Sequence, residues 1–199
     1  KTPEEAAAFV NKILAYHAPA AFGPWRNQLD FVADDEDQNL HLQDAEAVAA
    51  TVSATAPVFN SRKIYLDAFQ QESGGAGGRY PGANAAINSN IYNGTLLWNY
   101  TGHGGPQRLA EEVVLDQSLV HSWNNEYRLP LLITATCDFA TYDNPLVYSL
   151  GEDLLVRPKT GAIALMTTSR VVFANSNRVL HTNYVKTALE RDAQGQYKT

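Results

Sequence analysis

Short apolar runs alternate with stretches of mixed apolar and polar positions along this chain. Two runs, which start at Leu96 and Leu131, are rich in aromatic and β-branched residues and stop where small and polar residues begin. Such runs are typical of strands that are buried on both faces of a sheet. The pattern predicts these two strands and three others, at residues 28–33, 62–69 and 162–168.

Helical patterns fill the intervals between these strands. Helices are predicted at residues 4–16, 44–55, 83–92, 106–114, 116–123, 145–156 and 175–191. The first opens on a capping signature of Thr2, Pro3 and Glu5. We expect this helix to cover a face of the sheet with its apolar side, which comprises Ala8, Phe9, Ile13 and Leu14. The expected inner side of the last helix comprises Val179, Leu180, Tyr184, Val185 and Leu189.

The alternation of strand and helix predicts an α/β fold, in which a mostly parallel sheet lies between two layers of helices. One segment, residues 74–82, is rich in glycine and fits neither element. A phosphate-binding P-loop needs Gly-Lys-Ser/Thr at the start of a helix, and this segment lacks it. We therefore expect a flexible loop that crosses the edge of the sheet.

Composition and charge narrow the class of protein. The chain has 199 residues, of which 45% are hydrophobic and 18% charged, an ordinary balance for a globular domain. Its net charge of −6 argues against a nucleic-acid partner, which would require a basic stripe. The single Cys excludes an internal disulfide. Because the chain opens directly on a helix, we expect residues 1–199 to be one subdomain of a protein whose preceding subdomain is missing.

One reactive side chain follows each of the two apolar strands, His103 after the first and Cys137 after the second. Ligands collect outside the carboxyl ends of strands in an open parallel sheet, so we expect these side chains to face each other there. A free thiol, with a pKa near ~8.5, attacks slowly at neutral pH unless a neighbouring imidazole favours its thiolate. The pair therefore predicts a cysteine peptidase dyad.

Glycines flank the imidazole at Gly102, Gly104 and Gly105. A backbone without Cβ atoms turns sharply, admits a substrate carbonyl and can point N–H groups at a developing oxyanion. The alternatives are an inert buried thiol and a tight turn with an incidental histidine. A Gly-x-Ser-x-Gly elbow is absent. No zinc site is predicted, because no ligand spacing emerges from the other histidines, His17, His41, His121 and His181.

An acidic run follows the strand predicted at residues 28–33. It comprises Asp34, Asp35, Glu36 and Asp37, whose carboxylate oxygens suit a hard cation such as Ca²⁺. The spacing differs from that of the twelve-residue EF-hand loop. A solvated acidic loop is the alternative to a Ca²⁺ site, and no other cofactor is predicted.

Two ordered motifs resemble the gingipain-like cysteine peptidases, and most of all the PorU-type sortases of the type IX secretion system. They are NYTGHGG at residues 99–105 and ITATCDF at residues 133–139, and Cys137 comes 34 positions after His103. The likeness extends to WRNQ at 25–28, FVADDED at 31–37 and LAEE at 109–112. It therefore covers almost the whole chain.

The resemblance implies a caspase-hemoglobinase (gingipain-like) fold, a three-layer α/β/α arrangement. It also implies that His103 is the general acid–base and Cys137 the nucleophile that forms a thioester. The backbone N–H groups of Gly104 and Cys137 would form the oxyanion hole. The residues that would wall the specificity pocket are Thr168, Ser169, Arg170 and Phe173.

A sortase of this type is a cysteine endopeptidase or transpeptidase that removes the C-terminal sorting domains of exported proteins. It can pass the acyl group to a cell-surface glycolipid. Its partners would be polypeptide substrates and other type IX secretion components. The resemblance places it at the cell surface, associated with the outer membrane through parts outside this chain. The alternatives are a gingipain-like digestive protease and a non-catalytic binding module on the same fold.

Overall fold

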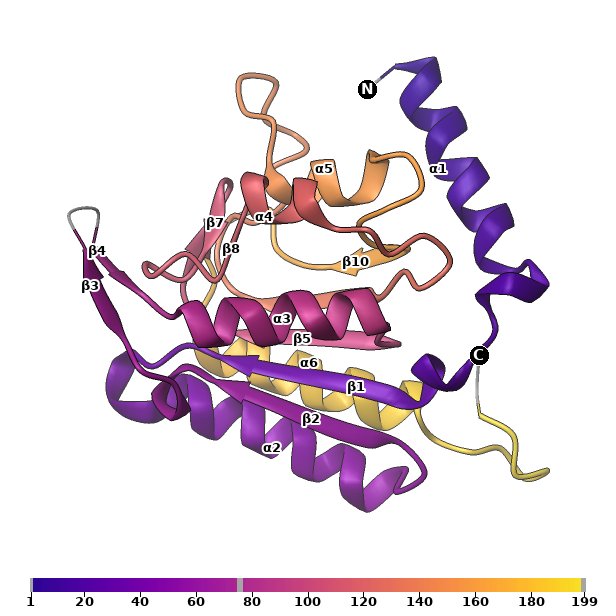
Figure 1. Cartoon of the computed structure of the whole chain (residues 1–199). Helices are drawn as coiled ribbons and strands as arrows, with labels where there is room; N and C mark the ends of the chain where they lie inside the picture. Colours follow the sequence, from indigo (N-terminus) through magenta and orange to yellow (C-terminus); the bar gives the residue numbers. More distant parts are fainter. Residues whose placement is uncertain (1, 75–76, 198–199) are drawn as a thin grey trace.

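The computed structural model describes residues 2–74 and 77–197. Within these residues, a five-stranded parallel sheet runs in the order β10-β9-β5-β1-β2 (Figure 1). Its strands are β1 (Gln28–Ala33), β2 (Asn60–Tyr65), β5 (Leu97–Thr101), β9 (Leu131–Ala135) and β10 (Ala164–Met166). The helices are α1 (Pro3–Tyr16), α2 (Leu40–Thr55), α3 (Pro81–Asn93), α4 (Gln117–Ser122), α5 (Leu150–Val156) and α6 (Ala174–Ala188). The predicted α/β class with a parallel sheet is confirmed.

Strand β5 shows how the sequence fills both faces of this sheet. All five of its residues are buried, and successive side chains point to opposite sides. Trp98 and Tyr100 stack on each other and pack with Ile87 and Ile91 of α3. Leu97 packs on the other side with residues of α2 and α6. The apolar run is therefore continuous because helices cover both faces of the sheet.

The chain reverses its direction of travel across the sheet between β1 and β5. It proceeds from β1 to β2 on one side, and then crosses back to β5, β9 and β10 on the other. The carboxyl ends of β1 and β5 therefore flank the topological switch point, where open parallel sheets bind their ligands. The acidic run and His103 follow these two strands, so both lie at this edge.

The segment after His103 differs from its prediction. Residues 106–114 were expected to be helical, but a small antiparallel sheet forms there from β6 (Gly104–Gly105), β7 (Arg108–Leu109) and β8 (Leu115–Asp116). Ala110 N–H donates to His103 C=O, a contact that a helix would prevent. Ala110 and Val113 have φ values of 57° and 59°, outside the helical region. Tertiary pairing therefore overrides a helical pattern of apolar positions.

Several other boundaries shift for local reasons. The predicted helix at 145–156 begins only at Leu150, because Ser149 caps it and forms a capping box with Glu152. The predicted strand at 62–69 ends at Tyr65, where the chain enters a 3₁₀ turn. The glycine-rich segment forms a hairpin of β3 (Glu72–Gly74) and β4 (Gly77–Arg79), while residues 75–76 lie outside the described residues. The short 3₁₀ helices are Pro19–Ala21, Pro24–Asn27, Asp37–Asn39 and Leu66–Ala68.

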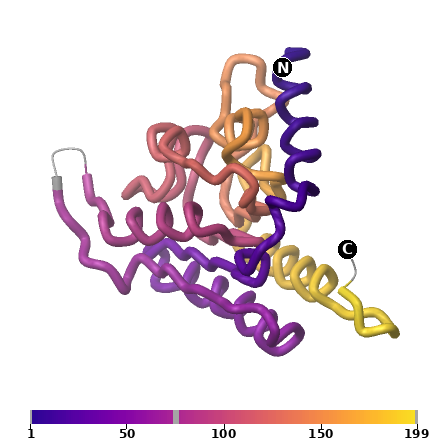
Figure 2. Tube along the Cα trace, turned by 45° about the vertical axis from the view of Figure 1, so that its right-hand side comes forward, coloured from indigo at the N-terminus to yellow at the C-terminus, as the bar shows by residue number. Residues whose placement is uncertain are grey.

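Helix α1 has the predicted capping box at Thr2 and Glu5 but not the predicted packing. It lies beside α5 at the margin of the molecule, away from the sheet (Figure 2). Its buried side chain is Lys12, whose Nζ donates to the carbonyls of Leu154 and Leu155 at the end of α5. Burial lowers the pKa of Lys12 to about 7. The expected apolar face was therefore wrong, and Leu14 is 66% exposed.

Helix α6 also turns a different side inward than its apolar pattern indicates. Val179 and Leu180 are exposed, whereas Asn177, His181 and Val185 are buried. A buried hydrogen bond between Asn99 of β5 and the His181 ring fixes this rotation of the helix. No helix in the described part of the chain combines the length and apolar character that crossing a bilayer requires.

Candidate active site

His103 and Cys137 stand at equivalent positions on neighbouring strands. β5 and β9 are parallel, and Thr101 is paired with Ala135 at their ends. His103 comes two positions after Thr101, and Cys137 comes two positions after Ala135. Both residues therefore lie beyond the same edge of the sheet. Gly102 N–H donates to Ala135 C=O at 3.1 Å and holds the two strand ends together. The structure therefore brings the imidazole and the thiol to the same rim.

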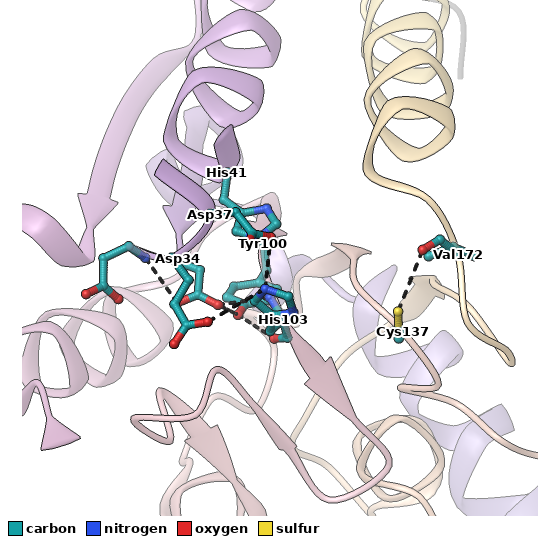
Figure 3. Close-up of polar contacts among 9 residues, drawn as sticks. Asp34, Asp37, His41, Tyr100, His103, Cys137 and Val172 are labelled. Atoms are coloured by element: carbon teal, nitrogen blue, oxygen red, sulfur yellow. Dashed lines mark hydrogen bonds and ion pairs between the residues drawn. The ribbon is translucent and has the colours of Figure 1, made fainter. Parts of the chain in front are cut away.

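Both side chains line one cavity of about 170 Å³. Asp37 and His41 form its wall on the side of the imidazole, and the start of α6 forms the wall on the side of the thiol. Figure 3 shows that the His103 ring is turned toward Asp37, while the Cys137 sulfur is turned toward Val172. None of the hydrogen bonds among the described residues joins this thiol to the imidazole.

Cys137 is half-buried, and its Sγ lies 3.8 Å from the carbonyl oxygen of Val172. The chain turns sharply after it, because Asp138 has a φ of 50°. The loop before α6 supports this turn: Asp138 N–H donates to Arg170 C=O, and the Thr168 hydroxyl donates to Thr136 C=O. The thiol is therefore held at an accessible turn rather than sealed in the aliphatic core.

Carboxylates hold both the backbone and the ring of His103. The Asp34 carboxylate accepts from His103 N–H at 2.9 Å, and Tyr100 Oη donates to His103 C=O at 2.6 Å. At the ring, Nε2 lies 3.1 Å from Asp37 Oδ2 and 3.8 Å from Glu36 Oε2. The imidazole is half-exposed. Its orientation is therefore set by Asp37 from outside and by Asp34 from beneath.

The glycines beside His103 are needed for close packing. A Cβ at Gly102 would overlap Asp34 Cβ and lie 2.5 Å from Tyr100 Oη. A Cβ at Gly104 would lie 2.5 Å from Thr136 Oγ1 and 3.0 Å from Leu109 Cδ2. At Gly105 a Cβ would meet nothing within 4 Å. Gly102 and Gly104 therefore let this loop approach both neighbouring strand ends.

His41 completes the wall behind the imidazole. It lies on α2, four residues after Asp37, and its Nε2 is 3.3 Å from Asp37 Oδ2. Its ring meets the His103 ring edge to face, with the centroids 5.0 Å apart. Burial, and then the neighbouring His103, lower the pKa of His41.

Two groups of side chains at this edge bring metal-ligating atoms together. Asp37, His41 and His103 form one group, and Asp34, Asp35 and Glu112 form the other. In each group the ligand atoms lie within 4.8 Å of one another. The first has the nitrogen and oxygen donors that zinc accepts, but it includes the imidazole of the candidate dyad. The second offers carboxylate oxygens alone, as hard cations prefer.

A family model for peptidase family C25 matches residues 1–198. The chain belongs to peptidase family C25. This family of gingipain-like cysteine peptidases acts on polypeptides. The chain is also similar to the crystal structure of the Arg-specific cysteine proteinase gingipain R, with 15% identity and a TM-score of 0.77. The match covers 95% of this chain and 43% of that one.

Two further solved structures support the same fold. The complex of the pro- and mature domains of RgpB from Porphyromonas gingivalis matches with 16% identity and a TM-score of 0.78, over 96% of this chain and 44% of that one. A structure described as a protease matches with 18% identity and a TM-score of 0.68, over 92% of this chain and 38% of that one. The family C25 chain therefore has the gingipain, caspase-like fold and spans less than half the length of these structures. No curated protein sequence matches it.

The residues expected to form the oxyanion hole and the specificity pocket are not all brought together. Gly104 lines a neighbouring cavity of about 600 Å³, which shares His103 with the cavity of Cys137. Of the four expected wall residues, Phe173 lines the cavity of Cys137. Thr168 instead supports the backbone of Thr136, and Arg170 pairs with Asp143 at the surface.

Reasoning from the sequence did not assign Asp37 and His41 to this family C25 site. Asp37 was treated as a cation ligand, and His41 as a histidine without context. Their spacing of four residues gives no helical signal, because Asp37 lies before α2 and not on it. The left-handed φ values of Asp37, Gln38 and Asn39, which bring Asp37 back toward His103, leave no trace in the sequence either.

Proposed function

We propose that this chain is the catalytic subdomain of a cysteine peptidase in which Cys137 is the nucleophile and His103 the general acid–base. The observation that carries the proposal is the placement of the two side chains at matching register on adjacent strands, in one cavity. The separation of the thiol and the imidazole is compatible with this role, because catalytic hydrogen bonds are often loose before substrate binds.

Asp37 supports the proposal through the nitrogen that it contacts. Its carboxylate accepts a hydrogen bond from Nε2, which places the ring proton on that atom and leaves Nδ1 as the proton acceptor. In the first step, Nδ1 takes the thiol proton as Sγ attacks the carbonyl carbon of the scissile peptide bond. The imidazolium then gives this proton to the leaving amine, and a thioester remains on Cys137.

The carbonyl oxygen that becomes negative in this step needs hydrogen-bond donors. The N–H groups of Cys137 and Gly104 are the proposed donors. The bond from Ala110 N–H to His103 C=O supports Gly104, because hydrogen-bonded pairs alternate with open pairs in an antiparallel ladder. Gly104 and Leu109 form the open pair next to it, so Gly104 N–H is not used by the ladder.

Within this class we propose the sortase reaction, in which the thioester passes to an amine instead of water. The motifs shared with the PorU-type sortases support this choice. The cavity beside Cys137 does not favour an arginine-specific digestive protease, because a buried guanidinium needs a carboxylate partner. Among the described residues that line this cavity the acid is Asp37, which is half-exposed and already bonded to His103.

The proposed substrates are exported proteins with C-terminal sorting domains, and the proposed location is the cell surface, at the outer membrane, beside other type IX secretion components. The test supplies a purified sorting-domain substrate and a small amine to the full chain, with Cys137→Ala as the control. We expect loss of the sorting domain and a product ligated to the amine.

The other outcomes separate the alternatives. Hydrolysis of many unrelated proteins without a ligated product would favour a digestive protease. A chain that binds the substrate but leaves it intact, and forms no thioester at Cys137, would favour a binding module on the peptidase fold.

A further inference from the structure

The cavity of Cys137 lies on the face of the sheet that α2 and α6 cover. Thr101, the last residue of β5, lines this cavity. Side chains alternate along a strand, so Thr101 points to the same face as Leu97, which packs with α2 and α6. His41 of α2 and Asn177 of α6 line the cavity from these two helices. The thiol therefore opens onto a space between the sheet and both helices.

Two polar side chains in the wall of this cavity have hydrogen-bonding groups that the fold does not use. His41 is 6% exposed, and its Nε2 is buried without an aligned partner, although Asp37 Oδ2 lies 3.3 Å away. Asn177 is 7% exposed, and its carboxamide makes no hydrogen bond with the described residues. Because buried polar groups are nearly always hydrogen-bonded, these two side chains indicate a polar partner that enters the cavity.

The cavity offers no free charge to such a partner. The described residues that line it include one acid, Asp37, and no Lys or Arg, and Asp37 is bonded to His103. Nearby, Asp44 of α2 pairs with Arg178 of α6 at 3.2 Å and ties the two helices together. Burial lowers the pKa of His41, which favours its uncharged ring. A charged side chain would therefore lose its water here without gaining an opposite charge.

The volume of the cavity limits the size of its occupant. It measures about 170 Å³, against about 600 Å³ for the cavity on the other side of His103. Pockets that bind drug-sized molecules have volumes of about 300–1,000 Å³. The cavity of Cys137 is therefore large enough for one short side chain and too small for a larger ligand.

We propose that this cavity binds the P1 side chain of the substrate, and that it selects one that is short, uncharged and able to form hydrogen bonds, with asparagine preferred. P1 is the residue whose carbonyl carbon Cys137 attacks, so the inference rests on the proposed function. A carboxamide has both donors and an acceptor, and so do the groups that face it, the imidazole of His41 and the carboxamide of Asn177. Asparagine can therefore bond both of them at once.

The selection depends on what each competing side chain leaves unpaired. A leucine at P1 would fill the space but leave His41 Nε2 and the Asn177 carboxamide buried without partners. Sites built to hydrogen-bond a substrate reject analogues that lack the bonding group. An arginine at P1 would be too long for the cavity and would also lack a carboxylate partner. The same two residues therefore disfavour both competitors, for different reasons.

Peptidyl acyloxymethyl ketones test the selection, because they alkylate a catalytic thiol after their P1 side chain has bound. The experiment uses the full chain and three probes that differ only at P1, with Asn, Leu or Arg, and follows modification of Cys137 by intact mass. Each rate is divided by the rate with iodoacetamide, which has no P1 side chain. The test variants are Asn177→Leu, which removes the carboxamide, and Asn177→Asp, which adds a carboxylate. The matched control is Asn183→Leu, at an exposed position of the same helix.

We expect the wild type and the control to react with the Asn probe faster than with the Leu or Arg probe, by roughly tenfold or more. Asn177→Leu should lose this preference, and Asn177→Asp should react faster with the Arg probe than the wild type does. Equal rates with all three probes in the wild type, or a preference for Leu or Arg, would overturn the P1 assignment and leave the proposed peptidase intact. If no probe modifies Cys137 faster than iodoacetamide does, the proposed function fails and this inference fails with it.

Discussion

His103 and Cys137 occupy the same register position beyond two adjacent parallel strands, two residues after the pair formed by Thr101 and Ala135. The arrangement lets two short segments, far apart in the sequence, share one cavity. A different group of contacts also holds each of the two side chains. Asp37 orients the imidazole, and the loop that ends at Val172 holds the thiol.

Asp37 is expected to act as a positioning residue for the His103 ring. The Asp37→Asn variant should lower kcat by about 10–100-fold and leave KM unchanged, because the ring loses its charged acceptor and a donating amide can hold the wrong tautomer, while the cavity remains. This is less than the ~10⁴-fold seen for a buried triad acid, since Asp37 is half-exposed. Steady-state kinetics on a sorting-domain substrate measure both constants.

Glu36 provides the matched control, because its carboxylate is near the same nitrogen but at 3.8 Å. Glu36→Gln should change kcat less than threefold, and Asp37→Glu should restore part of the loss. If Glu36→Gln is as damaging as Asp37→Asn, the effect comes from charge at the loop and not from a specific hydrogen bond.

Gly102 is expected to tolerate no side chain. Gly102→Ala would force a methyl group against Asp34 and Tyr100, at a cost of about 1–3 kcal/mol in the free energy of unfolding. Because Asp34 also holds His103 N–H, peptidase activity should fall as well. Gly105→Ala should be nearly neutral, since a Cβ there meets nothing within 4 Å. Urea unfolding of both variants measures the difference, and equal costs would contradict the packing described here.

His181 is expected to make the fold sensitive to acid. Burial lowers its pKa to about 4 from the ordinary 6.5, so between these values the unfolded chain binds the proton that the folded chain excludes. Stability should therefore fall as the pH falls from 6.5 to 4, by about 3 kcal/mol from this residue.

The comparison of two variants isolates this contribution from that of other titrating groups. The difference in unfolding free energy between pH 6.5 and pH 4.5 should shrink in His181→Gln and remain in His17→Gln, because His17 is exposed. A pH dependence that is the same in both variants would mean that the acid sensitivity arises elsewhere.

The strands and most helices could be predicted because the apolar pattern of each segment agrees with the burial that the fold gives it. β5 and β9 are buried along almost their whole length, and the sheet that they form is covered on both faces by helices. The prediction was wrong where a long-range contact overrides the local pattern. Ala110 pairs with His103 and abolishes the expected helix at 106–114. Lys12 binds the carbonyls at the end of α5, so that α1 does not turn its expected apolar face to the sheet.

In the candidate site, too, some residues are marked by the local sequence pattern and others are placed only by long-range contacts. The placement of His103 and Cys137 at one rim could be predicted from the sequence, because each follows an apolar run at an edge where parallel strands collect ligands. Asp37 reaches the site through a turn with left-handed backbone that no periodicity marks. Its role depends on tertiary placement, so only the structure shows it.

Alkylation of Cys137 by iodoacetamide at pH 6.5 tests the central claim most directly. The account predicts that the wild-type thiol reacts at least tenfold faster than a free thiol, and that His103→Ala removes this advantage while His17→Ala retains it. The same slow rate in all three proteins would show that the imidazole does not activate the sulfur, and would contradict the assignment of these two residues as a peptidase dyad.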